Sequence, residues 1–284
     1  MPKVAIVTDS IACLTRELVA QYGIEIIPII FYAGGKEHRD WVDITPSEAY
    51  ELFLQDPDSF KTSAASPEEC LQAFRNASQR AGSILCITLS TELSATYDSA
   101  REAKDIARTE LPQLSIEVMD SQTATSAEGL IAVAAARAAA EGKDLPEVVS
   151  IADAIKGKVN AIISLDTIQH VYRSGRIPKI ASQIGSALNI KPILTIHGKV
   201  HFNSAVRNRH HGIERMLQMM REKTGQKPVH VAVMHAYAPE EAEKLKERVA
   251  SEFNCVELWL AEFSPIMGYA CGTGTIGISF YSED

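Results

Sequence analysis

Short segments of strand length alternate with segments of helical spacing along the first 160 residues. Val4–Val7 is apolar, as expected of a strand that is buried on both faces, and Ile84–Leu89 and Leu114–Met119 are also strand-like. We also expect a single strand over Ile24–Phe31. Helical stretches follow these segments, and a long alanine-rich helix is expected to end at Gly142. This β–α alternation predicts a mostly parallel sheet with helices on both faces.

The pattern changes after about residue 160. A strand-like Pro192–Ile196, a His197–Gly198 turn and a strand-like Val200–Phe202 predict a β-hairpin, which is a feature of mixed sheets. A helix is expected over Ile180–Leu188. The fold class is therefore α/β with two domains. We expect an N-terminal domain at 1–160 with a mostly parallel sheet and flanking helices, and a mixed α/β C-terminal domain at 161–284.

Composition and charge narrow the classes of function. The chain has 284 residues, of which 46% are hydrophobic and 23% charged, as in ordinary globular proteins. The net charge of −8 argues against nucleic acid and against attraction to anionic membranes. The longest apolar stretch, Leu130–Ala140, is far below the ~20 residues that span a bilayer, so no stable membrane insertion is expected. The five cysteines form no CxxC pair, and the first apolar run is too short for a signal peptide, so we expect a cytoplasmic protein.

Several motifs do not support catalysis or metal binding. Gly272–Gly277 matches GxGxxG, but a strand-like segment follows it where a dinucleotide site needs a helix. The histidines at 197, 201, 210 and 211 lack an acidic partner at ligand spacing, so no metal is expected. Asp40 and Asp43 could form a carboxylate pair, although solvating or capping a loop is the simpler interpretation. No complete set of catalytic residues is present, so we assign no catalytic residue.

Two clusters of hydroxyl side chains are more informative. Thr62–Ser66 lies just before a predicted helix, and Leu89–Thr96 follows a strand and opens the next helix. Strand ends and helix starts converge on the ligand crevice of a parallel α/β sheet, and hydroxyls there suit a carboxylate or a phosphate. The alternative is that these residues only cap helices, as Ser66 does before Pro67. Thr62 and Ser94 remain open to either interpretation on these grounds.

At these residues the sequence resembles the DegV family of bacterial fatty-acid-binding proteins, over essentially the whole chain. The resemblance rests on the order and spacing of many short motifs rather than on any one of them. These motifs are Val7–Ser10, Asp40–Asp43, Thr62 and Ser63 with Ser66, Leu93–Tyr97, Asp120 and Ser121, Ser174–Ile177, Leu188–Ile193, Arg207, and Gly268–Gly277.

The resemblance implies a long-chain fatty acid held between two α/β domains, with its carboxylate bound by the hydroxyls of Thr62 and Ser94. It implies a non-enzymatic lipid carrier that presents the acid to a fatty-acid kinase, with no cofactor besides the bound acid. Further residues implied at the head group or at a partner surface are Arg207, Arg176, Ser63, Cys271 and Gly272. The N-terminal domain would supply the head-group hydroxyls and the C-terminal domain an acyl-chain tunnel. Candidate tunnel walls are Ile163, Ile168, Ile180, Ile184, Leu188, Ile190, Ile193, Ile266 and Met267.

The chain departs from the family pattern at two places. Ser94–Thr96 reads Ser-Ala-Thr where the family usually has Ser-Gly-Thr, which keeps the hydroxyl. Ala270 stands where the family's terminal loop has a histidine, so a role of that histidine does not carry over to this chain. The alternative function is an enzyme acting on a small phosphorylated or carbonyl substrate in the same crevice. It would use His235 as a base, although a structural role of His235 is the simpler interpretation.

Overall fold

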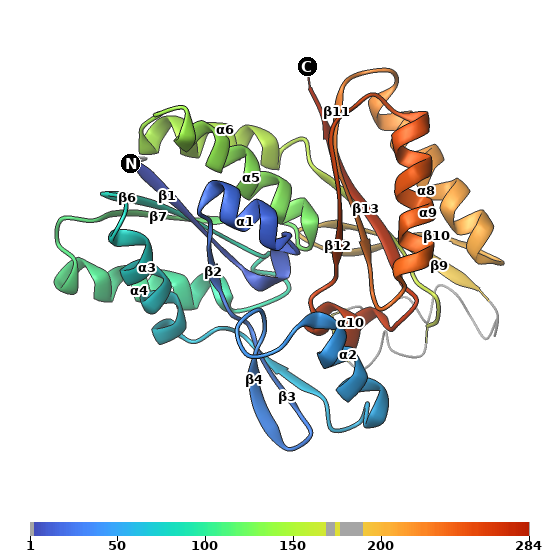
Figure 1. The fold of residues 1–284 in the computed structure, drawn as a ribbon, viewed down its shortest axis with the longest axis horizontal. Coiled ribbons are helices and arrows are strands. Elements are labelled where there is room, and N and C mark those ends of the chain that lie inside the picture. The colour runs from blue at the N-terminus through green and yellow to red at the C-terminus, as the bar shows by residue number, and fades with distance from the viewer. Residues whose placement is uncertain (1–2, 169–173, 177–189, 284) are drawn as a thin grey trace.

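The structure, a computed structural model, describes residues 3–168, 174–176 and 190–283 (Figure 1). In these residues the strands form three sheets. The strands are β1 (Val4–Asp9), β2 (Glu25–Ile27), β3 (Ile30–Ala33), β4 (Lys36–Arg39), β5 (Lys61–Ser63), β6 (Ser83–Thr88), β7 (Ser115–Asp120), β8 (Asn160–Ser164), β9 (Lys191–His197), β10 (Lys199–Val206), β11 (Val229–His235), β12 (Cys255–Glu262) and β13 (Ile276–Ser282). The helices are η1 (Ser10–Ala12), α1 (Arg16–Tyr22), α2 (Pro46–Gln55), α3 (Pro67–Ser78), α4 (Thr96–Glu110), α5 (Ser126–Ala140), α6 (Leu145–Lys156), α8 (Arg209–Thr224), α9 (Pro239–Glu252) and α10 (Pro265–Cys271).

The first sheet is entirely parallel, in the order β2-β1-β6-β7. Helices α3 and α4 pack on one side of it, whereas α5 and α6 pack on the other (Figure 1). Every residue of β1 is buried, because helices cover both faces of this parallel strand. The expected parallel α/β sheet is confirmed.

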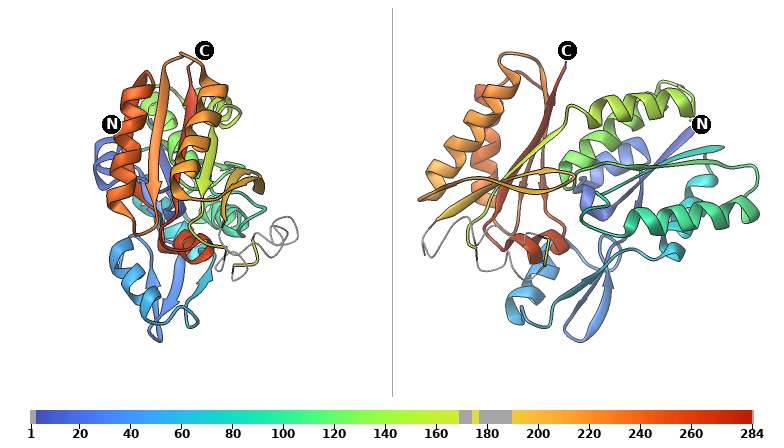
Figure 2. Two further views of the ribbon diagram at one scale, coloured as in Figure 1. Left: turned by 90° about the vertical axis from the view of Figure 1, so that its right-hand side faces the viewer. Right: turned by 180° about the vertical axis from the view of Figure 1, so that it is seen from behind.

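A small antiparallel sheet in the order β4-β3-β5 was not expected from the sequence. It projects from the rest of the molecule together with α2 (Figure 2). The single strand expected over Ile24–Phe31 is wrong, because β2 and β3 are separate and belong to different sheets. Pro28 stands between them, and proline cannot donate the hydrogen bond that a continuous strand requires at that position.

The third sheet is mixed, in the order β10-β9-β8-β13-β11-β12. Strands β11 and β12 are parallel, while the remaining neighbours are antiparallel. The hairpin expected around His197 and Gly198 is confirmed by the pairing of β9 with β10, with Gly198 at a φ of 66°. The helix expected over Ile180–Leu188 lies outside the described residues.

Helix α5 joins the parallel sheet to the mixed sheet. It packs on β1 and β6 on one side and on β8, β11 and β13 on the other. Small side chains allow this close approach, and a Cβ at Gly129 would overlap the carbonyl oxygen of Ala12. One hydrophobic core therefore runs from β1 through α5 into the mixed sheet. In the part of the chain that the structure describes, no helix has the length and apolar character needed to cross a bilayer.

Candidate functional site

The topology of the parallel sheet marks a place for a ligand. From β1 the chain passes to β2 on one side, and it later crosses to β6 on the other side of β1. The loops that follow β1 and β6 therefore diverge, and the crevice that such loops leave at the carboxyl ends of the strands is where open α/β sheets bind ligands. Ile11 follows β1, and Leu89 follows β6.

A cavity opens at this position. The space between its atoms is about 830 Å³, a figure that includes open solvent at its mouth. All three sheets or their connecting segments contribute to its wall, which is mainly aliphatic with a few polar groups. The lining residues are Ile11, Ile29, Thr62, Ser63, Ala64, Leu89, Leu93, Ser94, Ile163, Leu165, Ser174, Arg176, Leu194, Ile196, Val200, Ile266, Met267, Tyr269, Ala270 and Cys271.

Thr62 and Ser94 come together in the wall of this one cavity, although they come from different parts of the fold. Thr62 lies on β5, paired with Phe31 of β3, and is half-buried. Ser94 lies in the loop between β6 and α4 and is also half-buried. Its Oγ is 2.9 Å from Oγ1 of Thr96 and accepts the backbone N–H of Thr96 at 3.3 Å. If the Thr96 hydroxyl donates to Ser94 as well, the hydroxyl hydrogen of Ser94 is free to donate to a ligand.

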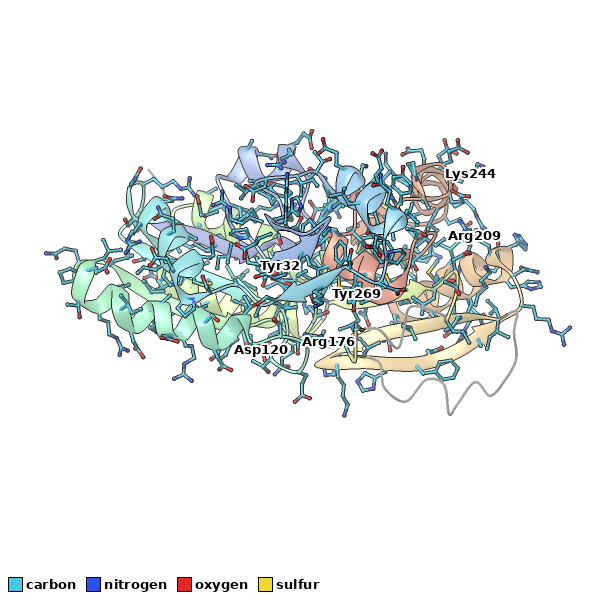
Figure 3. The ribbon with its side chains drawn as sticks, turned by 90° about the horizontal axis from the view of Figure 1, so that it is seen from below. Tyr32, Asp120, Arg176, Arg209, Lys244 and Tyr269 are labelled. Carbon is cyan, nitrogen blue, oxygen red and sulfur yellow. The ribbon has the colours of Figure 1, made fainter. Side chains whose placement is uncertain are left out.

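Arg176 supplies a positive charge at the cavity wall. Its guanidinium holds the loop of Ser94, because Nε donates to the carbonyl oxygen of Leu93 at 3.3 Å, and Nη1 donates to that of Ser174 at 2.7 Å. The side chain is exposed, so it lies where the cavity meets solvent. Figure 3 shows Arg176 and Tyr269 on the lower face of the molecule, between the parallel and the mixed sheets.

Of the other residues that the resemblance implied, some line the cavity and some do not. Ser63 and Cys271 line the cavity. Burial raises the pKa of the Cys271 thiol to about 12, so the thiol is neutral near pH 7, and it donates to the carbonyl oxygen of Met267 at 2.9 Å. Gly272 is buried, and Arg207 is exposed just beyond β10; neither is among the described residues that line the cavity.

The structure places only some of the candidate tunnel walls at the cavity. Ile163, Ile266 and Met267 line the cavity, whereas Ile193 packs in a separate core cluster with α8 and α9. Ile168 and Ile190 are absent from the described lining. Ile180, Ile184 and Leu188 lie outside the described residues. Sequence reasoning missed the aliphatic residues Ile11, Ile29, Leu89 and Leu93 of the N-terminal half, although their place after strands was a usable signal.

The structure also places the motifs that were set aside from the sequence. The loop from Gly272 leads into strand β13 and not into a helix, so it does not have the geometry of a dinucleotide site. Among residues 3–168, 174–176 and 190–283, no group of three or more metal-ligating side chains is assembled. His235 is buried, and its Nδ1 accepts the backbone N–H of Ala238 at 3.2 Å. Burial lowers the pKa of His235 to about 4, and the residue does not belong to the described cavity lining, which favours its structural interpretation.

Comparison with known protein families gives a match over nearly the entire chain. A family model described as "Uncharacterised protein, DegV family" matches residues 3–283. A DegV domain-containing protein of Clostridium perfringens is 30% identical over 283 residues, which cover 99% of both chains. Another, from Caldanaerobacter subterraneus, is 36% identical over 195 residues, covering 69% of this chain and 68% of the relative.

Solved structures share the fold over their full length. A DegV family protein from Thermus thermophilus, described by its fatty acid binding, is 27% identical with a TM-score of 0.89 and full coverage of both chains. DegV from Bacillus subtilis, described as a fatty acid binding protein, is 25% identical with a TM-score of 0.88 and the same coverage. A stearic-acid-binding protein from Eubacterium ventriosum is 25% identical with a TM-score of 0.89, covering 99% of this chain and 98% of that protein. These solved structures therefore share the α/β fold of this chain.

Proposed function

The chain belongs to the DegV family, and from this premise we propose that its cavity binds a long-chain fatty acid whose carboxylate is held by Thr62 and Ser94. The observation that carries the proposal is the position of both hydroxyls in the wall of a single, mainly aliphatic cavity. The solved relatives described as fatty-acid-binding proteins support the class of ligand.

The head group of such a ligand needs hydrogen-bond donors. A carboxylate at the end of an apolar cavity loses its hydration, and without donors this loss raises its pKa and weakens its retention. Hydroxyl donors to a carboxylate form charge-assisted hydrogen bonds of about 1.5–3 kcal/mol each. The guanidinium of Arg176 adds a favourable charge at the cavity wall without being required to bind both carboxylate oxygens.

The aliphatic tail supplies most of the affinity. About 14 buried methylenes at ~0.8 kcal/mol each give ~11 kcal/mol before the costs of association are subtracted. Those costs are several kcal/mol, which leaves a dissociation constant in the micromolar to nanomolar range. Walls that bear isoleucine, leucine and methionine side chains from both halves of the fold can enclose such a tail. The division of the chain at residue 160, with the hydroxyls before it, is part of this proposal.

The fate of the bound acid is the finer part of the proposal. We assign the chain the role of a carrier that presents the carboxylate to a fatty-acid kinase and performs no chemistry itself. Two hydroxyl donors can leave a carboxylate oxygen free to attack the phosphorus of a phosphate donor held by the kinase, whereas a bidentate arginine would occupy both oxygens. Ala270 lines the cavity and carries no titratable group, so any proton transfer in that step would depend on other residues or on the kinase.

Native mass spectrometry of the purified protein tests the binding function. We expect an added mass that corresponds to a long-chain acid, and expect the delipidated protein to take up palmitate in preference to hexadecane. A protein that carries no lipid and takes up no added fatty acid would refute the proposal. Acyl phosphate formation by the chain alone with ATP would refute the carrier role while leaving binding intact.

A further inference from the structure

Two carboxyl groups are buried next to the cavity without lining it. Asp9 is 0% exposed and Asp40 is 2% exposed, and neither belongs to the residues that form the cavity wall. Buried carboxyl groups destabilise a fold unless they are well bonded, so their presence calls for a reason. Their hydrogen-bond partners supply one.

Asp9 binds the backbone of two segments of the cavity wall at once. Its Oδ1 accepts the N–H of Ile11 at 3.0 Å, and its Oδ2 accepts the N–H of Leu89 at 2.9 Å. Ile11 and Leu89 both line the cavity. Leu89 also begins the loop that ends in Ser94, so Asp9 fixes the start of the segment that carries a proposed head-group ligand.

Asp40 is linked through two serine hydroxyls to two further segments of the cavity wall. Its Oδ2 accepts the hydroxyl of Ser264 at 2.6 Å, and the Ser264 Oγ in turn accepts the N–H of Ile266 at 3.3 Å, at the start of α10. Asp40 also accepts a hydrogen bond from Ser10, whose Oγ accepts the N–H of Ile29 at 3.2 Å. Ile29 and Ile266 line the cavity, as do four further residues of α10.

We infer that Asp9 and Asp40 are positioning residues of the ligand cavity: as carboxylates they fix the segments at Ile11, Leu89, Ile29 and Ile266 whose side chains form its wall. The inference rests on the proposed function for its consequence in binding, but its structural content does not need a ligand. A neutral carboxyl or carboxamide group accepts hydrogen bonds less strongly than a carboxylate, so the order of the wall depends on the charge of these two groups.

The surroundings of both groups work against that charge. Burial raises the pKa of Asp9 to about 7 and that of Asp40 to about 6. Burial and the neighbouring Asp9 also raise the pKa of Glu128, which accepts the Thr8 hydroxyl at 2.9 Å. The titratable groups that face the two carboxyls from adjoining elements are Glu128 of α5, Arg16 of α1, Tyr50 of α2, Cys70 of α3, Cys86 of β6 and Cys13.

The sign of the pH dependence is therefore opposite for stability and for binding. Both carboxyls hold protons more tightly in the folded chain than in the unfolded chain, so their contribution to the free energy of unfolding is largest at acidic pH. This contribution falls as the pH rises from about 4 to about 7. Over the upper part of the same interval both groups become carboxylates, the wall segments are held more firmly, and the affinity for the fatty acid rises. A purely structural role would not produce this opposition.

The test compares Asp9→Asn and Asp40→Asn with the exposed control Asp153→Asn, using a dansyl-labelled long-chain fatty acid between pH 5.5 and pH 8. For the wild type and the control we expect affinity to rise about tenfold across this interval, the equivalent of one charge-assisted hydrogen bond. In either buried variant we expect affinity at pH 8 to fall about tenfold and the pH dependence to flatten. Measuring the variants against the control removes the ligand's own titration.

Hydrogen exchange of the ligand-free proteins gives the second reading. We expect faster exchange of the peptide covering residues 89–95 in Asp9→Asn and of the peptide covering residues 28–31 in Asp40→Asn, with unchanged exchange in β11. Wild-type affinity and pH profile retained in both variants, with unchanged exchange, would overturn the inference. If Asp9→Asn does not fold, Asp40→Asn decides by the same criteria. If the wild type binds no dansyl fatty acid, the proposed function fails, and the exchange data alone decide the positioning role.

Discussion

The proposed head-group site is tested by variants that remove the hydroxyls of Thr62 and Ser94 and otherwise keep the shape of each side chain. Thr62→Val keeps the β-branched side chain of β5, and Ser94→Ala deletes one oxygen. Each change removes a donor worth about 1.5–3 kcal/mol toward a carboxylate, so we expect each single variant to bind a long-chain acid at least tenfold more weakly. The double variant is expected to bind the acid about a hundredfold more weakly while it remains folded.

The assay is displacement of a dansyl fatty acid by palmitate and, separately, by hexadecanol. The wild type is expected to prefer the acid, and the double variant to lose most of this preference, because Arg176 is then the main group of the wall that still favours a carboxylate. Ser94→Ala also removes the partner of the buried Thr96 hydroxyl, which is 2.9 Å away, and this costs stability by itself.

Ser66→Ala is the matched control for that loss. Ser66 caps α3 through a 3.1 Å hydrogen bond to the N–H of Glu69, and it does not belong to the cavity wall. It should lower the free energy of unfolding by about 1 kcal/mol and leave acid binding unchanged. A double variant that still prefers palmitate to hexadecanol as strongly as the wild type does would refute the placement of the head group.

Three further predictions concern the cavity wall. Gly268→Ala would place a methyl group in the ring of Tyr50, so we expect thermal denaturation to show a loss of about 3 kcal/mol, and a wild-type melting temperature would contradict the packing of α10 on α2. Burial raises the pKa of Cys271 to about 12, so its thiol should react with iodoacetamide far more slowly than a small thiol at pH 8, and bound palmitate should slow the reaction further. Rapid alkylation, monitored by mass spectrometry, would contradict the place of Cys271 in the cavity wall. Ala64→Trp should fill the cavity and abolish dansyl fatty acid binding with little change in the circular dichroism melting curve, and undiminished binding would show that the ligand lies elsewhere.

The parallel sheet and the position of the cavity after its strands could be predicted because they depend on local pattern. β1 and β6 each contain an apolar run that predicts a strand, and Ser94 lies in the loop that follows β6. The break at Pro28 was also readable, since a proline inside an apolar run argues against one continuous strand. These features need only neighbours along the chain.

The remainder of the site depends on contacts between distant segments. Asp40 and Ser264 are 224 residues apart, and nothing in the sequence around Asp40 distinguishes a buried anchor from the loop-solvating carboxylate that was expected. That expectation is wrong for Asp40, which is 2% exposed, whereas the exposed Asp43 accepts hydrogen bonds from Arg39. The complete aliphatic wall could not be predicted either, because its residues come from both halves of the fold. Ile11 and Ile163, for example, line one cavity only because α5 packs against both of the larger sheets.

A crystal structure of the delipidated protein with added palmitate tests the central claim most directly. The account predicts continuous density for the acyl chain between the parallel and the mixed sheets, with a carboxylate oxygen ~2.5–3.0 Å from Thr62 Oγ1 and from Ser94 Oγ. Density for the carboxylate at another wall of the cavity, or palmitate bound outside the cavity, would contradict it.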